Sequence, residues 1–338
     1  MVGVLPRKRW CRSTAIDAPG SWIPRHAEGM PRVVDTAHLR PALAALIGSC
    51  DVDGGPTDEQ FALAGALATG YFHTTVDPRS VQPLGPDEAS EQLDDEVLRT
   101  RVFHLMVVAE FCRHPLTRSQ VLRTEDYARA FGISDEGQRL ARDLMAAGNA
   151  VAEADYLRIF NDHRLELEEP VLAHHGDGGA GTVPDEVFER LTHLGDCPPG
   201  SLGRAVAEFY AANGLELPGP DDPYAGVFVA HDMSHVIAGY EATGLEEVAL
   251  GAMQIGIADT EVHWVQFLGN IGVHEARFIH HTDGPPVLAA PGAMEVLAHA
   301  FDRGSATAED FTLVDHLSMV DLPLEEVRER FGVPPRER

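Results

Sequence analysis

Positive charge is scarce in this chain. The sequence has 26 Lys and Arg residues against 53 Asp and Glu, a formal net charge of -27, and Lys8 is its single lysine. Proteins that bind nucleic acids draw most of their non-specific affinity from a basic face, and docking on an anionic membrane surface also needs basic residues. The charge therefore argues against a nucleic-acid partner and against electrostatic docking on anionic lipid.

Cysteine is also rare, with four residues at widely separated positions, Cys11, Cys50, Cys112 and Cys197. They form no CxxC pair, which fits reduced thiols in a cytosolic protein better than a disulfide framework. Cysteine ligation of a metal is not expected. The apolar run from Met1 to Pro6 is too short for a signal peptide, and arginines follow it directly.

Long apolar runs are missing too. The most apolar stretch, residues 248–273, is interrupted by Asp259, Glu261 and His263, so it falls short of the roughly 20 apolar residues that a transmembrane helix needs. No transmembrane segment is expected. We expect a cytoplasmic protein, whose contact with a membrane would be peripheral at the inner face.

What the sequence does contain is apolar patterning with a period near 3.6 residues, which predicts an all-α fold, a multi-helix globular bundle. Hydrophobic residues make up 44% of the 338 positions, enough for a sizeable core. Capping and breaker residues predict helices over residues 37–47, 57–72, 90–113, 118–131, 134–160, 201–213, 293–301 and 324–331, with another beginning at Thr307. A proline-rich stretch at 73–85 and a glycine-rich stretch at 176–181 suggest three parts, residues 1–85, 86–175 and 183–338.

The most informative motif is His-Asp-x-x-His followed by a glutamate. On a helix, His231, Asp232 and His235 lie within about a quarter-turn of one face. Two imidazoles and a carboxylate together suit zinc or another first-row divalent ion. Gly239 predicts the end of this helix, and a second helix packed antiparallel to it would bring Glu247 to the same place. The alternative is that the histidines cap a helix end and the acids are solvated.

The start of that second helix is predicted from Thr243 and Glu246, which read as a capping box. In a capping box the glutamate side chain turns back toward the backbone N–H of the N-cap residue. Glu246 would then be occupied at the helix start, and Glu247 would be free to act as a metal ligand.

Three stretches of the last third, taken together, resemble the ubiquinone (coenzyme Q) biosynthesis protein 4 family. They are residues 199–204 (PGSLGR), the His-Asp-x-x-His motif with its trailing Gly-Tyr and Glu247, and residues 324–328 (LEEVR). Their order and spacing agree with that family over residues 183–338. The middle stretch is the most specific, and the terminal Leu-x-x-x-Arg is weak alone. Glu246 stands where the family usually has glycine, and Val229-Ala230 replaces a polar or basic approach to the motif.

The resemblance implies an all-helical protein that holds a divalent metal, usually discussed as zinc, and works in quinone biosynthesis. Members are implicated in oxidative removal of the ring carboxylate from a prenylated hydroxybenzoate-derived precursor and in organising other quinone-biosynthesis enzymes. Carried over by position, the metal ligands would be His231, Asp232, His235 and Glu247. The resemblance does not cover the first 180 residues, and a homo-oligomer is left open.

A hydrophobic substrate needs an apolar wall, and residues 248–267 are predicted to form one long apolar helix that begins beside Glu247. The candidate substrate-binding residues on it are Met253, His263, Trp264 and Phe267. Core packing is the simpler role for most apolar residues of such a helix, and a hydrogen-bonded core position is the commoner one for a histidine.

Two other functions remain open at this point. A non-catalytic scaffold would bind the isoprenoid or quinone precursor and use the metal structurally, which four protein ligands and no open position would favour. An HD-type phosphohydrolase would recruit His104 and Asp315 to the His-Asp pair but leaves Glu247 unexplained. A zincin peptidase is not indicated, because its motif has glutamate where this chain has Asp232.

Overall fold

The structure is a computed structural model that describes residues 34–134, 136–172, 185–218, 222, 224–279 and 284–336. Within those ranges the protein is all-α, as predicted, with no strand. The α-helices are α1 (Thr36–Cys50), α2 (Asp58–Ala66), α3 (Pro86–Gln92), α4 (Glu96–Phe111), α5 (Arg118–Phe131), α6 (Glu136–Ala147), α7 (Asn149–Leu167), α8 (Asp185–Thr192), α9 (Leu202–Asn213), α10 (Ala225–Ala238), α11 (Gly244–Ile257), α12 (Glu261–Asn270), α13 (Ala293–Ala306) and α14 (Leu324–Phe331). Short turns of 3-10 helix form η2 (Pro78–Ser80), η3 (Leu194–Asp196) and η5 (His316–Met319), and π-helical turns form η1 (Leu67–Tyr71) and η4 (Ile271–Glu275).

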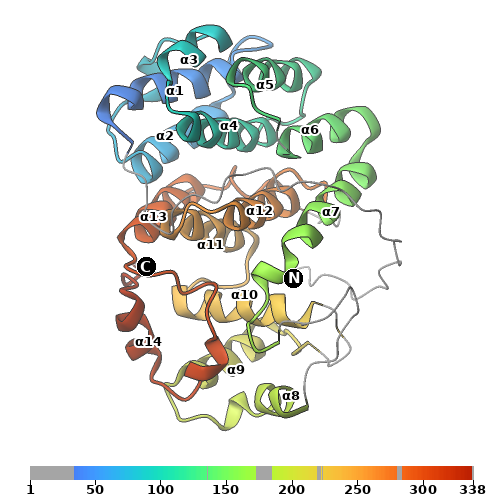
Figure 1. Ribbon diagram of the computed structural model, residues 1–338, viewed down its shortest axis with the longest axis vertical. Coiled ribbons are helices and arrows are strands. Elements are labelled where there is room, and N and C mark those ends of the chain that lie inside the picture. The colour runs from blue at the N-terminus through green and yellow to red at the C-terminus, as the bar shows by residue number, and fades with distance from the viewer. Residues whose placement is uncertain are drawn as a thin grey trace.

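The helices are arranged in three tiers along the long axis of the molecule (Figure 1). Helices α1 to α6 lie at one end, α11, α12 and α13 lie across the middle, and α8, α9, α10 and α14 lie at the other end, with α7 running between the tiers. The middle tier therefore separates the N-terminal helices from the helix that carries the His-Asp-x-x-His motif.

Local capping signals account for several helix boundaries. Thr57 and Gln60 form the predicted capping box at the start of α2, with the Gln60 N–H donating to the Thr57 hydroxyl at 3.1 Å. The helix predicted over residues 90–113 is two helices instead, because Asp95 accepts the Leu98 N–H at 2.8 Å and so begins α4. Gly148, at φ 88°, likewise divides the helix predicted over residues 134–160 into α6 and α7.

The helix predicted to begin at Thr307 is wrong. Residue 307 instead ends α13, where its hydroxyl donates to the carbonyl of Arg303 at 2.9 Å. The next helical turn is η5, which begins at His316. A Thr-x-x-Asp pattern therefore stands at a helix end here, where the threonine hydroxyl bonds backward along the chain.

Close backbone contact joins the helices of the middle tier. Helix α13 packs against α11 where Gly256 faces Gly304, and against η1 where Gly70 faces Ala298. A Cβ added at Gly70 would stand 2.2 Å from the carbonyl oxygen of Ala298. Glycine is therefore needed at these crossings because the backbones approach too closely for a side chain.

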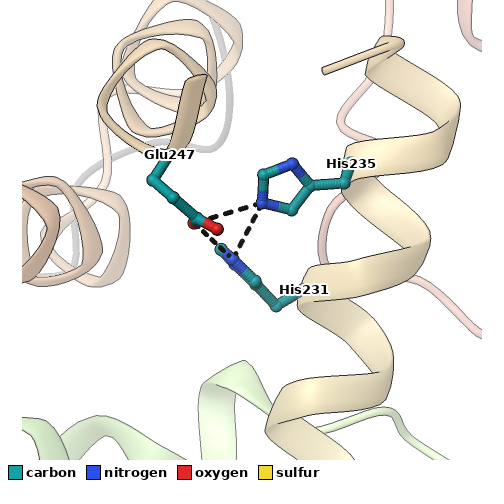
Figure 2. A group of neighbouring side chains, drawn as sticks. All are labelled: His231, His235 and Glu247. Atoms are coloured by element: carbon teal, nitrogen blue, oxygen red, sulfur yellow. Dashed lines mark hydrogen bonds and ion pairs between the residues drawn. The ribbon is translucent and has the colours of Figure 1, made fainter. Parts of the chain in front are cut away.

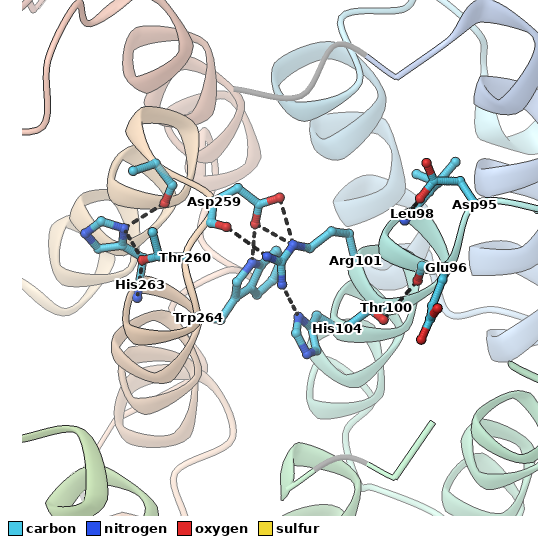
Figure 3. A network of polar contacts seen from close by, with 11 residues as sticks. Asp95, Glu96, Leu98, Thr100, Arg101, His104, Asp259, Thr260, His263 and Trp264 are labelled. Atoms are coloured by element: carbon cyan, nitrogen blue, oxygen red, sulfur yellow. Dashed lines mark hydrogen bonds and ion pairs between the residues drawn. The ribbon is translucent and has the colours of Figure 1, made fainter. Parts of the chain in front are cut away.

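A polar network links the N-terminal tier to the middle one (Figure 3). Arg101 of α4 donates from Nε to the Asp259 carboxylate at 2.7 Å and from a terminal nitrogen to the Asp259 carbonyl at 2.8 Å. Trp264 donates its indole N–H to the same carboxylate at 2.6 Å. The Arg101 and Asp259 side chains are only 13% and 10% exposed, so each charge relies on the other to offset the loss of its contact with water.

The core is continuous across the tiers. One cluster of buried apolar side chains contains residues from Ala42 to Phe331, and helices of the expected first and last parts contact each other directly, as η1 and α13 do. The three expected parts are therefore packed together, and whether any of them folds alone stays a prediction. The glycine-rich stretch at 176–181 lies outside the described residues. Among the described helices, none combines the length and the apolar character that crossing a membrane requires.

Candidate metal centre

Two helices bring three of the predicted ligands together. Helix α10 places His231 and His235 one turn apart on the same face, and it ends at Gly239 in the left-handed conformation at φ 76°. The chain then turns and starts α11, whose first turn contains Glu247. Figure 2 shows the two imidazoles of α10 and the Glu247 carboxylate pointing toward one another.

The donor atoms form a nearly equilateral triangle. The Nε2 atoms of His231 and His235 lie 3.1 Å apart, and Oε2 of Glu247 lies 3.0 Å from the first and 3.1 Å from the second. Ligand atoms around a tetrahedral zinc ion lie about 3.3 Å from one another, given bond lengths near 2.0–2.1 Å. Two imidazoles and one carboxylate also match the zinc donor set, so these residues fit a divalent metal ion.

The orientation of His235 adds to this fit. Its Nδ1 lies 3.3 Å from the carbonyl oxygen of Tyr240, its ring stacks on Phe209 with centroids 5.6 Å apart, and its side chain is 1% exposed. An Nδ1–H that donates to the carbonyl leaves the Nε2 lone pair facing the other two donors. Histidine ligands of metal ions are commonly held in this way.

The electrostatics of the three residues are strongly coupled. Burial works to raise the pKa of Glu247, but the neighbouring His235 and His231 hold it well below its usual range. Burial works to lower the pKa of His231, but the Glu247 carboxylate raises it, and the net result is a raised pKa. The pKa of His274, in η4, is lowered by burial and by the two nearby histidines. His274 thus lies beside the centre, and no motif in the sequence singles it out.

Asp232 is placed differently from the other three predicted ligands. Its carboxylate accepts a hydrogen bond from the Tyr210 hydroxyl of α9, and burial raises its pKa. Neighbouring residues on a helix are turned about 100° from each other, so Asp232 points away from the face that His231 and His235 share. The group of ligand atoms that lie within 4.8 Å of one another contains His231, His235 and Glu247. Tyr210 of α9 is thus a polar partner of the motif.

The predicted capping box at the start of α11 is wrong, because the Thr243 side chain makes no capping hydrogen bond. Glu246 instead accepts the backbone N–H of Glu241 and pairs with Arg336 at 2.6 Å. The outcome that mattered for the site is unchanged, since Glu246 is occupied near the helix start and Glu247 is free to face the histidines.

Three arginines from the C-terminal part of the chain bind the end of α10. Arg328 donates to the carbonyls of residues 236 and 237, both at 3.0 Å. Arg303 donates to the carbonyl of residue 238 at 2.9 Å, and Arg336 to that of residue 239 at 2.9 Å. The last carbonyls of a helix lack partners within it and carry partial negative charge, so these arginines satisfy the helix end that bears His235.

The predicted apolar wall is interrupted. Residues 248–267 belong to two helices, because α11 ends at Ile257 and Thr260 begins α12 by accepting the His263 N–H at 3.4 Å. Each of the candidate substrate-binding side chains is buried: Met253 0%, His263 0%, Trp264 6% and Phe267 0% exposed. His263 contacts the Thr312 hydroxyl at 3.0 Å and the Ala258 carbonyl at 2.7 Å (its neighbourhood is drawn in Figure 3). All four side chains lie in the core packing.

The two residues that an HD-type phosphohydrolase would need are engaged elsewhere. His104 stacks near Trp264, with ring centroids 4.9 Å apart, and Asp315 accepts the Ser318 N–H at 3.0 Å to begin η5. Neither belongs to the group of ligand atoms that contains His231. The structure therefore gives no support to that alternative.

Comparison with known proteins adds little. No protein-family model matches the chain, and no curated protein matches it. A candidate ubiquinone biosynthesis protein from Nostoc punctiforme is a similar solved structure, at 18% identity and a TM-score of 0.33, over 70% of this chain and 99% of that one. At that identity and TM-score the likeness carries no argument about this chain.

Proposed function

We propose that the protein is a metal-dependent enzyme of quinone biosynthesis that acts on a prenylated aromatic acid by oxidative decarboxylation of the ring. The observation that carries the proposal is the triangle of His231, His235 and Glu247, whose facing atoms are 3.0 to 3.1 Å apart. The resemblance of the surrounding motifs to the ubiquinone biosynthesis protein 4 family supplies the substrate class.

A metal ion explains this triangle better than hydrogen bonds alone. Two imidazole Nε2 atoms at 3.1 Å face each other and the same carboxylate oxygen, an arrangement in which lone pairs converge. A divalent cation would offset the charge of Glu247 and let an anionic ring carboxylate approach a chain of net charge -27.

The position of Asp232 favours an enzyme over a scaffold. Structural zinc sites have four protein ligands, whereas catalytic sites have three and keep a position open for water or substrate. Here three side chains converge, and the fourth candidate is hydrogen-bonded to Tyr210 instead. A site with three protein ligands leaves room for a substrate oxygen.

A bound divalent ion would act as a Lewis acid on the substrate's carboxylate and phenolate. His231, His235 and Glu247 would hold it, and the hydrogen bond from Tyr210 keeps the Asp232 carboxylate occupied outside this group. Zinc has no redox chemistry of its own, so dioxygen must be the oxidant, acting on the electron-rich ring directly or through a redox-active ion in place of zinc.

The residues predicted to bind the prenyl tail lie in the core, so they do not form a surface on which the tail could bind. The substrate's apolar tail would bring the protein to the membrane surface by hydrophobic contact, or a partner enzyme would deliver the substrate. Contact of this kind would be peripheral, at the inner face of the membrane.

The test combines metal analysis with turnover. The His231→Ala, His235→Ala double variant is expected to hold one divalent ion per chain fewer than the parent, while the exposed His299→Ala serves as the control. Incubation of the metal-loaded protein with long-chain and tail-less aromatic acids under dioxygen should release carbon dioxide, measured by mass spectrometry. Unchanged metal content in the double variant would refute the ligand assignment. Tight binding without turnover, under any metal or oxidant, would favour the scaffold.

A further inference from the structure

A second group of metal-ligand side chains is made of other residues than the first centre, although Glu275 follows His274 in η4. Glu59 of α2, His114 just after α4 and Glu275 of η4 have ligand atoms that all lie within 4.8 Å of one another. His114 Nε2 is 2.6 Å from Oε1 of Glu275. Three elements that are far apart in the sequence thus converge on one point, and they share no residue with the first centre.

The two glutamates of this second group differ in how they are held. The Glu275 side chain is fully buried, and its Oε2 accepts the Leu288 N–H at 2.8 Å, so that carboxylate is fixed in place. Oε1 of Glu59 is also buried but has no hydrogen-bond partner among the described residues. Buried polar atoms are nearly always paired, so this oxygen calls either for a proton shared with Glu275 or for a cation that both carboxylates bind.

Charge leads to the same conclusion. Two carboxylates and one imidazole in mutual contact remain net negative even when the imidazole is protonated. Burial and the facing Glu275 raise the pKa of Glu59 to about 7. Such a pair is relieved either by a shared proton or by a cation, and an imidazole with two carboxylates is a donor set for manganese, iron or zinc.

We propose that Glu59, His114 and Glu275 form a second site for a divalent first-row transition-metal ion. The His114 side chain is 32% exposed and lines a hollow of about 280 Å³ together with Phe111, Leu144 and Met145, so one ligand of the site is open to solvent. His114 would exchange its contact with Glu275 for the ion, and Glu59 would supply the oxygen that now lacks a partner.

The experiment removes the first centre before testing the second. In a chain that carries His231→Ala and His235→Ala, Mn²⁺ binding is followed by the electron paramagnetic resonance signal of the free ion, and Zn²⁺ binding by elemental analysis after dialysis. We expect one equivalent of ion per chain in this background. Adding Glu59→Gln or His114→Gln should weaken binding by more than about 100-fold, beyond the range typical of residues that only support a ligand. Asp58→Asn, an exposed neighbour on the same helix, should leave it unchanged.

Circular dichroism melts show whether each variant folds. If the double variant does not fold, Glu59→Gln is made in the otherwise unaltered chain, where the second site predicts the loss of one equivalent of bound ion. Failure of the background chain to bind either ion would overturn the second site and show that the carboxyl pair shares a proton. Equal affinity with and without Glu59→Gln would overturn it as well. Because the first centre is absent, neither result depends on the proposed function.

Discussion

Replacing Gly304 with alanine should push apart the two helices that position Glu247. A Cβ at this position of α13 would stand 2.2 Å from the carbonyl oxygen of Met253 and 2.8 Å from Cα of Gly256, both in α11. Both obstacles are backbone atoms, so no side-chain rotation can relieve the contact. The helices must move instead.

The size of the effect follows from the overlap. Real Cβ atoms essentially never approach closer than 3.0 Å, so the carbonyl contact has to open by about 0.8 Å, the difference from 2.2 Å. Overpacking of a well-packed core costs about 1–3 kcal/mol, while alanine recovers roughly 0.8–1.0 kcal/mol relative to glycine inside a helix. Because both obstacles are backbone atoms, the upper part of the overpacking range applies, about 2–3 kcal/mol, so the free energy of unfolding should fall by about 1–2 kcal/mol. Metal affinity should fall as well, because Glu247 belongs to α11.

Urea unfolding followed by circular dichroism measures the first effect, and metal titration measures the second. Gly65→Ala is the matched control, because a Cβ at that position in α2 meets no atom within 4 Å. It should stabilise the protein by roughly 0.5–1 kcal/mol. A Gly304→Ala variant as stable as the parent, with unchanged metal affinity, would refute the reasoning.

Three further predictions follow from buried charges. Arg101→Met should cost about 3–5 kcal/mol in urea unfolding, since it leaves the buried Asp259 carboxylate unpaired, and adding Asp259→Asn should restore part of the loss; no restoration would contradict the pairing. Glu247→Gln should remove one equivalent of bound metal in a titration, while Glu246→Gln, which weakens the pair with Arg336 and the hydrogen bond from the Glu241 N–H, should cost at most about 1 kcal/mol; the reverse ranking would show that the ligand is misassigned. Burial raises the pKa of Glu110 from 4.5 to about 8, so between these pH values the carboxyl is ionised in the unfolded chain but still protonated in the folded one. The free energy of unfolding therefore falls as the pH rises from about 4.5 to 8. Glu110→Gln should remove that loss, which amounts to up to about 4 kcal/mol at pH 8, and equal pH dependence of the two melting curves would refute it.

What the sequence predicted well depends on neighbours along the chain. The capping box of Thr57, the left-handed Gly239 and the shared face of His231 and His235 each involve residues within four positions. Such signals act through the local backbone, so they can be read without the fold. The antiparallel hairpin that delivers Glu247 was predicted from Gly239 together with a capping box at Thr243 that the structure does not form.

What the sequence missed depends on residues far apart. Thr243 and Glu246 have the residue types and spacing of a capping box. Glu246 instead pairs with Arg336, 90 positions away, and accepts the backbone N–H of Glu241. Likewise, the apolar run over residues 248–267 hides the end of α11, because both α11 and α12 are buried and apolar residues occur on every face. Glu59 and Glu275, 216 positions apart, meet only through the fold.

The last of the three family-like stretches, weakest as a pattern, is tied directly to the proposed centre. Arg328 of that stretch binds two of the last carbonyls of α10, and Arg303 and Arg336 bind the next two. Their positive charge stabilises the negative end of the helix at its final turn, where His235 lies. The same turn presents the Tyr240 carbonyl to Nδ1 of His235, so a shift of the helix end would turn the imidazole away from its neighbours. The C-terminal arginines therefore act as positioning residues for His235, which they do not touch, and this connects the terminal Leu-x-x-x-Arg stretch physically with the His-Asp-x-x-His motif.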